Sequence, residues 1–512
     1  MPRKSIPHRV LLALIPRPLA PNRVRAAKSY FPSASCVLCL CTVALLFASC
    51  SALCAAEPIN IFRSVGPGNT AALDSGTDSK TITIKDSMAT FGGAGLPDTI
   101  GVGDVVLIDS DNDHEIDILC FIQGRKDKSS FEVKAANGEP VKPVANASLW
   151  TIYRAYTALG DALVGKENSG IPTAFRNFDS WEGGNDLVQA NAVWNIACYG
   201  DNGKADGPAV INNWKTGPGL YVRIYTPYSS TEVGRSQRHA GKWDSEKYRI
   251  ESTIAKTGIL SPRVQSQNYA RIEGLQFLAT STAAMSYDHS TVNLKADSSW
   301  VTDCIVKHEG PPKARPGKIR VGIHMEGIGC VIRNNIVYGY TGDKNAKGIN
   351  LDCLNDATNR VYLCYNNTIV NCTQGLWCQN VQGIIINNLA VGCSKGFDTG
   401  SGLGNQCDYN SSNTGDGIVR APLKAELSPW NTKAIPATDI FVDPAKEDFH
   451  IRADAVVRGM GLNLFTTLTL DAKDKPNTYG QFSKDIDGNP RPASGMWSLG
   501  ADEPTAPVRS SP

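Results

Sequence analysis

Three features that would narrow the function directly are missing from this sequence. After residue 56, no stretch is apolar enough to span a membrane. The ten cysteines in that part contain no Cys-x-x-Cys pair with zinc-site spacing. A basic excess is also absent, since residues 57–512 hold 44 Lys and Arg against 49 Asp and Glu, a net charge of −5. We therefore expect no transmembrane segment in the mature chain and no nucleic-acid partner.

Acidic residues are missing altogether from the first 56 positions. Seven Lys and Arg precede an apolar run at Val37–Ala48, and small residues follow up to Ala56. This order predicts a secretory signal segment, residues 1–56, that is cleaved after Ala56, so we expect the protein to be secreted or held at the cell surface. A lipoprotein anchor at Cys50 is the alternative, although Phe47 stands where Leu is usual.

What the sequence does contain is an internal repeat. Arg333–Tyr340 reads RNNIVYGY, Tyr365–Cys372 reads YNNTIVNC and Ile386–Cys393 reads INNLAVGC, and weaker copies, IEGLQF and VTDCIV, lie upstream. The last two full copies are 21 residues apart. A period in the twenties, built from short runs rich in Val and Ile, is typical of strands in a stacked solenoid.

Each full copy carries two consecutive Asn residues. Asn tolerates the left-handed backbone of a coil corner, and its amide can bond to an Asn of the next coil as a ladder. We therefore expect six Asn residues to be structural: Asn334, Asn335, Asn366, Asn367, Asn387 and Asn388. Cys372 and Cys393 share one position in the repeat and should stack on adjacent coils, as thiols or as a disulfide.

The regions around the repeat suggest an all-β chain with two folded parts. Residues 57–160 are expected to form a small N-terminal β domain, because short alternating strands separated by turns occur there. Residues 166–503 are expected to form the solenoid with its caps and closing segment, including a helix near Asp186–Trp194, because a solenoid must cover its ends. Residues 504–512 have the composition of a disordered tail.

The C-terminal segment adds a recognisable signature. It contains Phe441–Pro444 (FVDP), Asp448–Ile451 (DFHI), Asp485–Pro492 (DIDGNPRP) and Trp497–Glu503 (WSLGADE). This series is similar to the closing signature of many secreted bacterial β-helix proteins, and the repeats resemble those of the right-handed parallel β-helix (pectin-lyase-like) superfamily. The resemblance covers roughly residues 166–503. It implies a right-handed parallel β-helix solenoid, so the expected architecture is such a solenoid preceded by the small N-terminal β domain of residues 57–160.

The resemblance leaves the activity open, because the superfamily includes polysaccharide lyases, glycoside hydrolases, uronate epimerases and non-catalytic adhesins. This sequence lacks the paired-Asp and Gly-His-Gly motifs of the polygalacturonase-like hydrolases. It also lacks the Asp-Pro-His-Asp type motif of the mannuronan epimerases. Both absences disfavour the corresponding subclasses.

The repeat nominates one set of outward side chains. In each strand that follows a repeat Gly, the first residue should point inward and the next outward. Aligning the glycines gives one column of His324, Asn350, Trp377 and Asp398, and a second column of Glu326, Asp352 and Gln379.

The composition of these columns suits a sugar-binding groove. Trp377 offers a flat apolar face to a pyranose ring. Glu326 and Asp352, on neighbouring coils, are expected within about 5 Å of each other, where two carboxylates raise one pKa or hold a cation. Lyases that this fold resembles use Ca²⁺ to neutralise a uronate carboxyl and a Lys or Arg as base; Lys347, Lys307 and Arg333 are the nearby basic residues here.

We take Glu326, Asp352, His324 and Lys347 as candidate catalytic residues, and Trp377 and Asn350 as candidate substrate-binding residues. The alternative is an ordinary solvated face, because the outward positions of any such solenoid are polar.

Two further clusters lie outside the repeat. Asp109, Asp111, Asp113 and Asp117 place carboxylates at alternate positions between two expected strands, which suits Ca²⁺; the alternative is an acidic hairpin turn. In the polar insertion after residue 228, Arg238, His239 and Lys242 could bind a uronate carboxylate; the alternative is a solvated loop.

Two functions of different classes remain. The first is a secreted β-helix protein that binds an acidic polysaccharide and, if it is an enzyme, cleaves it by lyase-type β-elimination. The second is a non-enzymatic cell-surface or adhesion module. Detection of an unsaturated uronate product would separate them.

Overall fold

The computed structural model describes residues 57–111, 113–180, 183–254, 269–281, 289–294, 297–310, 320–327, 329–342, 344–352, 361–379, 382–399, 406–413, 435–464 and 483–504. The expected signal segment, the alternative anchor at Cys50 and the expected tail beyond Pro504 lie outside the described residues. Residues 57–512 group as one compact unit by their contacts.

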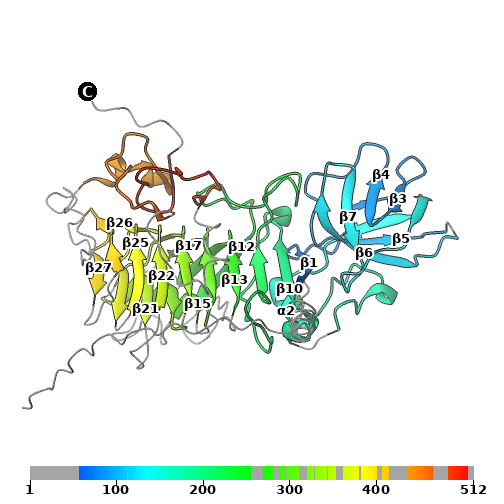
Figure 1. Cartoon of the computed structure of the whole chain (residues 1–512), viewed down its shortest axis with the longest axis horizontal. Helices are drawn as coiled ribbons and strands as arrows, with labels where there is room; N and C mark the ends of the chain where they lie inside the picture. The colour runs from blue at the N-terminus through cyan, green and yellow to red at the C-terminus, as the bar shows by residue number, and fades with distance from the viewer. Residues whose placement is uncertain are drawn as a thin grey trace, which may run out of the picture. The chain divides into compact units, whose positions relative to one another are not determined.

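The chain is nearly all β, and most of its strands belong to three parallel sheets (Figure 1). The nine-stranded sheet contains, in spatial order, β1 (Ile59–Val65), β10 (Ala192–Cys198), β11 (Val222–Tyr225), β13 (Arg271–Glu273), β16 (Trp300–Thr302), β19 (Val331–Arg333), β22 (Val361–Tyr365), β25 (Gln382–Ile386) and β28 (Gln406–Asp408). The seven-stranded sheet contains β12 (Arg249–Ile254), β14 (Gln276–Ser281), β17 (Ile305–Glu309), β20 (Ile336–Tyr338), β23 (Thr368–Val370), β26 (Leu389–Val391) and β29 (Ser411–Ser412). The five-stranded sheet contains β15 (His289–Leu294), β18 (Arg320–Met325), β21 (Ala346–Asp352), β24 (Gln374–Gln379) and β27 (Lys395–Thr399).

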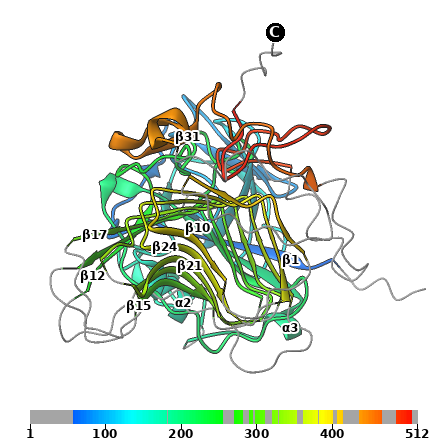
Figure 2. The same cartoon turned by 90° about the vertical axis from the view of Figure 1, so that its left-hand side faces the viewer.

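From β13 onward the chain visits the three sheets in a fixed rotation. β13, β14 and β15 lie in the nine-, seven- and five-stranded sheets, and β16, β17 and β18 repeat that order. Viewed from the end, the sheets surround a shared interior (Figure 2). The interior side chains stack in register: Ile272, Val301, Ile332, Cys364 and Ile385 pair on successive strands, and each is 0% exposed. The upstream copies of the repeat therefore belong to the same array.

The two Asn residues of each repeat have different jobs. Asn334, Asn366 and Asn387 hold the left-handed corner, with φ of 51°, 54° and 59°. The second Asn of each pair turns inward and forms a ladder, in which Asn335 Nδ2 donates to Asn367 Oδ1 at 3.0 Å and Asn367 Nδ2 donates to Asn388 Oδ1 at 2.9 Å. The structural expectation for these residues is confirmed. Asn410 extends the ladder by one step, since it accepts from Asn388 Nδ2 at 2.8 Å.

The N-terminal region forms an eight-stranded antiparallel sheet. Its strands, in spatial order, are β2 (Asp74–Ser75), β9 (Trp150–Tyr153), β5 (Val105–Ile108), β6 (Ile118–Arg125), β7 (Ser130–Lys134), β4 (Met88–Phe91), β3 (Ile82–Lys85) and β8 (Val144–Ala147). The N-terminal domain was expected to begin at residue 57, but β1 pairs with β10 in the nine-stranded parallel sheet and so does not belong to the antiparallel sheet. In the sequence, the antiparallel sheet is thus inserted between β1 and β10, which are neighbouring strands of the parallel sheet.

This antiparallel sheet also covers one end of the solenoid interior. Val105, Leu107 and Phe121 from β5 and β6 share a buried cluster with Trp194 and Ile196 of β10. Such a cap is required where the first parallel strands would otherwise expose apolar surface.

The helices within the described residues are short. These residues contain α2 (Leu159–Val164) and α3 (Leu187–Ala190), with 3₁₀ turns η1 (Thr173–Phe175), η2 (Asp201–Gly203), η4 (Ala437–Asp439) and η5 (Pro444–Lys446). The helix expected near Asp186–Trp194 is wrong in extent. It ends after Ala190 because Asn191 takes a left-handed conformation, φ 46°, and β10 starts at Ala192.

The C-terminal signature packs on the outer faces of two parallel sheets. β30 (Phe441–Asp443) and β31 (Asp448–Ile451) form a hairpin, and Phe441 and Phe449 share a buried cluster with Ile336 and Val370. Trp497 is fully buried against side chains of the nine-stranded sheet. This segment therefore closes over the outside of the parallel sheets.

Eight cysteines of the described part are buried and form no disulfide, and Cys372 and Cys393 are among them, which favours stacked thiols at that position. Within the same residues, none of the helices has the length and apolar character needed to cross a bilayer.

Candidate functional site

The outward column expected from the repeat lies in register on the five-stranded sheet. Asn350 pairs with His324 on one side and with Trp377 on the other, and Trp377 pairs with Asp398. The expected register is confirmed. We call these four residues, together with Lys347 and Asp352 of β21, the outer strip.

The sequence produces this strip by the alternation of inward and outward side chains along each strand. Ile349 and Leu376 point into the core and are 0% exposed, so the residues that follow them face outward. Gly348 sits where a Cβ would lie 2.6 Å from Cγ2 of Ile369. The close packing at this position therefore requires glycine between Lys347 and the inward Ile349.

Lys347 is the most unusual residue of the strip. Its side chain is buried, its Nζ lies 3.3 Å from the centre of the Trp377 ring, and it donates to Asn350 Oδ1 at 3.2 Å. Burial lowers the pKa of Lys347 to about 8, although Asp352 and Asp398 oppose the shift. A substantial fraction of this amine is therefore neutral in mildly alkaline solution. Because Lys347 covers one face of Trp377, a sugar ring can stack only on the opposite face.

The two carboxylates beside Lys347 differ in their partners. Asp398 accepts from Lys395 Nζ at 2.7 Å and from Gln374 Nε2 at 2.8 Å. Burial raises the pKa of Asp352, and the charge of Lys347 counters this only in part. Asp352 is therefore the carboxyl of the strip that takes up a proton more readily than a free aspartate.

The remaining catalytic candidates are His324, on β18, and Glu326, just after β18. His324 Nε2 lies 3.4 Å from Glu326 Oε1, and His324 Nδ1 lies 3.3 Å from the Ser290 hydroxyl. Glu326 follows Met325, which pairs with Leu351, so it lies beside the strand that carries Asp352. The structure thus brings His324 and Glu326 together; a direct pairing of Glu326 with Asp352 stays a prediction.

The expected basic loop does not act as one cluster. Arg238 lines a cavity over the nine-stranded sheet, whereas the outer strip lies on the five-stranded sheet. His239 is 3% exposed, its Nε2 lies 2.9 Å from the Asp303 carbonyl oxygen, and burial lowers its pKa to about 3. Lys242 lies 3.5 Å from Asp448. We therefore correct the expectation for His239, because a buried neutral imidazole offers no charge to a carboxylate.

The aspartates expected to bind metal are grouped in part. Asp109, Asp111 and Asp113 have carboxylate oxygens within 4.8 Å of one another. Asp117 instead accepts from the backbone nitrogen of Ser110 at 2.8 Å and from its hydroxyl at 2.5 Å. Lost hydration and then the neighbouring carboxylate of Asp113 raise the pKa of Asp111. Three of the four expected ligands thus converge, as carboxylates that repel one another without a cation.

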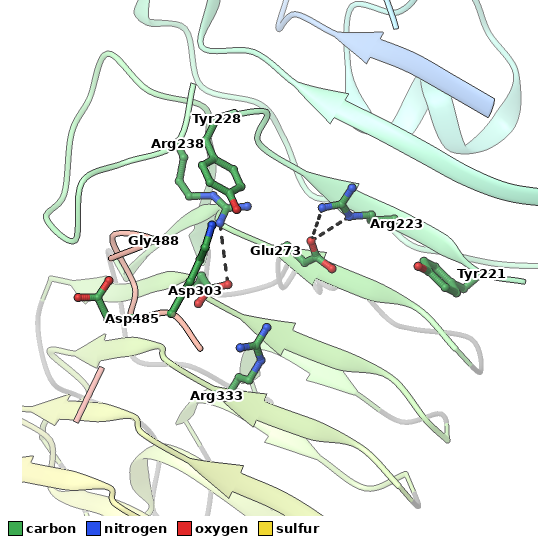
Figure 3. A pocket seen from close by; sticks show the side chains of 10 residues that line it. Tyr221, Arg223, Tyr228, Arg238, Glu273, Asp303, Arg333, Asp485 and Gly488 are labelled. Atoms are coloured by element: carbon green, nitrogen blue, oxygen red, sulfur yellow. Dashed lines mark hydrogen bonds and ion pairs between the residues drawn. The ribbon is translucent and has the colours of Figure 1, made fainter. Parts of the chain in front are cut away.

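A cavity over the nine-stranded sheet was missed by the sequence reasoning (Figure 3). Glu273 and Arg333 are the last residues of β13 and β19, and Arg223 lies within β11. They line the cavity with Arg238 of the insertion loop and Lys484 of the C-terminal segment. A signal was present, because charged residues stand within or at the end of the strands in VRIY, RIEG and VIRN. The sequence did not indicate that the insertion loop and the C-terminal segment lie over these residues of the nine-stranded sheet.

A second acidic cluster, His450 with Asp487 and Asp502, was also not foreseen. His450 Nδ1 lies 2.6 Å from Asp448 Oδ1 and its Nε2 lies 3.0 Å from Asp487 Oδ2. Hydrogen bonding to Asp487, opposed by burial, raises the pKa of His450 to about 10. His450 therefore forms ion pairs with Asp448 and Asp487 within the closing segment.

Comparisons with known proteins do not identify a family for this chain. No family model matches the sequence, and no curated protein matches it. One solved structure with some likeness is the tailspike Gp54 of Acinetobacter baumannii bacteriophage AP22, solved in complex with A. baumannii capsular saccharide. It shares 9% sequence identity over 68% of this chain and 60% of the tailspike, less than two thirds of that protein, with a TM-score of 0.14. A TM-score this low supports no argument about fold or function.

Proposed function

We propose that this chain is a secreted right-handed parallel β-helix protein that binds an acidic polysaccharide along the outer strip. The observation that carries the proposal is the registered column on the five-stranded sheet, with Lys347 held between Trp377, Asp352 and Asp398. The fixed rotation of the chain through three parallel sheets supports the β-helix. The general preference for right-handed parallel connections supports its hand.

The strip has the chemistry that an anionic sugar chain requires. Protonated Lys347 offers positive charge to a uronate carboxylate, and Asn350, which is 0% exposed, orients Lys347 by accepting from its Nζ. His324 offers an imidazole on the neighbouring strand, and the partly buried Trp377 offers ring surface to a pyranose. Successive strands are about 4.8 Å apart, so these groups form an extended row rather than a single point. A row suits a polymer that lies across several strands.

The lowered pKa of Lys347 also supports a lyase as the enzymatic version of this proposal. Neutral Nζ would take the proton from the carbon next to the uronate carboxyl. The electron pair left behind forms a carbon–carbon double bond with the neighbouring carbon and expels the glycosidic oxygen from that carbon. The expelled oxygen takes a proton from water. A base works best when its pKa lies near the working pH.

The test is retention of the protein by alginate, polygalacturonate and heparin in affinity electrophoresis, with neutral amylose as the control polymer. We expect slower migration with at least one acidic polymer and none with amylose. Trp377→Ala should reduce the retention, Trp377→Phe should keep most of it, and Lys166→Met, at an exposed site elsewhere, should leave it unchanged. Retention by amylose alone, or by no polymer, would overturn the proposal. Ultraviolet absorbance of an unsaturated uronate then separates a lyase from a binding module.

We also propose that Ca²⁺ binds at Asp109, Asp111 and Asp113 and stabilises the turn between β5 and β6. Carboxylate oxygens are the ligands that Ca²⁺ prefers, and a cation would relieve the repulsion among the three. Binding to the folded state alone raises the melting temperature as Ca²⁺ increases. Asp111→Asn should weaken that response, whereas Asp86→Asn, on another exposed turn, should not. An unchanged melting temperature between excess Ca²⁺ and a chelator would refute this site.

A further inference from the structure

A second cavity lies against the outer face of the first three parallel strands. Phe62 of β1, Asn195 of β10 and Arg223 of β11 pair in register and line it. Gln123 of β6 and Lys134 of β7 line it from the inserted antiparallel sheet. Its volume is about 570 Å³, within the roughly 300–1,000 Å³ that is typical of small-molecule sites. We call it the inter-sheet cavity.

The inter-sheet cavity adjoins the cavity of Figure 3. Tyr221 and Arg223 line both cavities. Figure 3 shows them at the end of the smaller cavity, about 290 Å³, that lies away from Asp485. The two cavities therefore form one groove, which crosses β1, β10 and β11 and continues over β13. We call it the long groove.

The walls of the long groove are held in place before any ligand binds. Gly138, in the turn after β7, has φ +85°, and a Cβ there would lie 2.6 Å from Cγ2 of Ile59. This turn therefore packs directly against β1, and both residues line the groove. Arg223 is fixed by Glu273, whose Oε2 accepts from its Nε at 2.9 Å and from its Nη2 at 2.7 Å. A preformed groove loses little conformational entropy when it binds.

A break in the strand pairing places Gln123 in the lining of the groove. Between Ile122 and Gly124, β6 advances by two residues while its partner β7 advances by one, from Val133 to Glu132. Such a bulge turns a side chain out of the regular alternation. The Gln123 amide forms no hydrogen bond within the part of the chain that the structure describes. An amide offers both a donor and an acceptor, and so complements a sugar hydroxyl, which also does both.

The lining of the long groove carries no excess of positive charge. Among the described residues, two carboxylates and two cations line the inter-sheet cavity, and three carboxylates and four cations line the cavity of Figure 3, with Arg223 shared. The whole groove thus has five of each sign. Some of them already face each other, since Glu273 accepts from Arg223 and Lys134 lies 3.9 Å from Glu132. An anionic ligand therefore gains no net attraction here, and a neutral polar ligand is the better match.

Aromatic rings and strand spacing indicate the form of that ligand. Phe62 and Tyr221 line the inter-sheet cavity and are only partly buried, so each leaves ring surface toward it. Apolar ring faces beside amides suit the flat faces and rim hydroxyls of pyranose rings. Phe62, Asn195 and Arg223 form a row across strands about 4.8 Å apart. An extended β-linked chain can follow such a row, whereas an α-linked glucan such as amylose coils away from it.

We infer that the long groove is a second binding site, which takes a short, neutral, β-linked oligosaccharide. Gln123 and Asn60 bind its hydroxyl groups, and Phe62 and Tyr221 contact its rings. The site lies on the nine-stranded sheet, whereas the outer strip lies on the five-stranded sheet. It takes a different class of ligand from the outer strip and so does not depend on the proposed function.

The test is isothermal titration calorimetry of the full chain with three neutral trisaccharides, namely cellotriose, xylotriose and triacetylchitotriose. We expect at least one of them to bind at a single site. Gln123→Ala should weaken that binding roughly fivefold, the loss expected for one neutral hydrogen bond. It should leave the melting temperature unchanged, because the Gln123 amide bonds to none of the described residues.

Two further variants test the aromatic contact and the specificity of the loss. Tyr221→Ala should weaken binding more than Gln123→Ala does, and Tyr221→Phe, which keeps the ring, should weaken it less than Tyr221→Ala. Gln189→Ala is the matched control, because Gln189 is exposed on α3 and lies outside the groove lining. It should leave the affinity unchanged.

The contrary results are distinct from one another. Binding of none of the three trisaccharides, or equal binding by the parent and by Gln123→Ala and Tyr221→Ala, would overturn the site. Tighter binding of trigalacturonate that Gln123→Ala also weakens would show that the assignment to a neutral ligand is wrong. Neutral binding that is lost in Trp377→Ala but kept in Gln123→Ala would place the ligand on the outer strip. Loss of neutral binding with intact retention by an acidic polymer would overturn this site alone, and the reverse pattern would overturn the proposed function alone.

Discussion

Replacing Asn367 by Leu should destabilise the protein far more than replacing its neighbour Asn366 by Gly. Asn367 is fully buried and stands in the middle of the inward ladder. Its Nδ2 donates to the Ile332 carbonyl oxygen at 3.0 Å and to Asn388 Oδ1 at 2.9 Å, and its Oδ1 accepts from the backbone nitrogen of Asn335 at 3.0 Å. Leucine has nearly the same shape and makes none of these bonds.

The magnitude follows from which groups keep a partner. Asn388 Oδ1 still accepts from the backbone nitrogen of Asn367, so that loss is partly compensated. The Asn335 nitrogen and the Ile332 oxygen each lose a partner in a buried environment. An unsatisfied buried polar group costs about 1–3 kcal/mol, so two such groups give about 2–5 kcal/mol after a small gain from the apolar side chain.

The assay is urea unfolding followed by tryptophan fluorescence, with the unfolding free energy extrapolated to zero denaturant. Asn366 holds a left-handed corner, φ 54°, which glycine adopts without steric cost. Asn366→Gly should therefore change the unfolding free energy by less than about 1 kcal/mol. Similar losses of unfolding free energy in the two variants, or an Asn367→Leu variant as stable as the parent, would contradict a stabilising role of the Asn ladder.

Three further outcomes are expected. Stability of the closing segment should be full below the usual pKa of histidine and should fall as the pH rises toward about 10, since ion pairing raises the pKa of His450; His450→Gln should flatten this dependence in thermal melts. If the protein is a lyase, its rate should rise as the pH passes about 8, and Lys347→Arg, which stays charged, should abolish product while retaining the polymer. Burial raises the pKa of the Cys120, Cys304 and Cys330 thiols to about 12, so a thiol reagent should label them only after unfolding, and rapid native labelling would contradict the packing.

The repeat was sufficient to predict the strand register. A one-residue slip would turn every inward side chain outward, so the positions of Ile349, Leu376 and Phe397 also fix those of Asn350, Trp377 and Asp398. The same logic predicted stacked Asn residues. It did not predict that the first Asn of each pair would hold the corner and only the second would form the ladder.

The cavity could not be predicted in the same way. Arg238, Glu273 and Lys484 come from an insertion loop, a strand end and the closing segment, and no periodicity connects them. The fate of His239 was equally hidden, because a basic loop gives no sign of which side chain will be buried. Sequence periodicity reports on neighbours along the stack, and these residues meet through segments that fold back over it.

The pairing of β1 with β10 has a consequence for the order of folding. Ile59 and Ala192 are 133 positions apart, whereas Leu363 and Ile384 in later strands are 21 apart. Closing the longer loop costs about 1.6 kcal/mol more in chain entropy if the segment between is unstructured. The antiparallel sheet lies within that segment, so its prior folding would draw the two ends together and reduce the cost. We therefore expect the N-terminal sheet to fold before β1 pairs with β10. The later parallel strands are expected to assemble through contacts that are local in sequence.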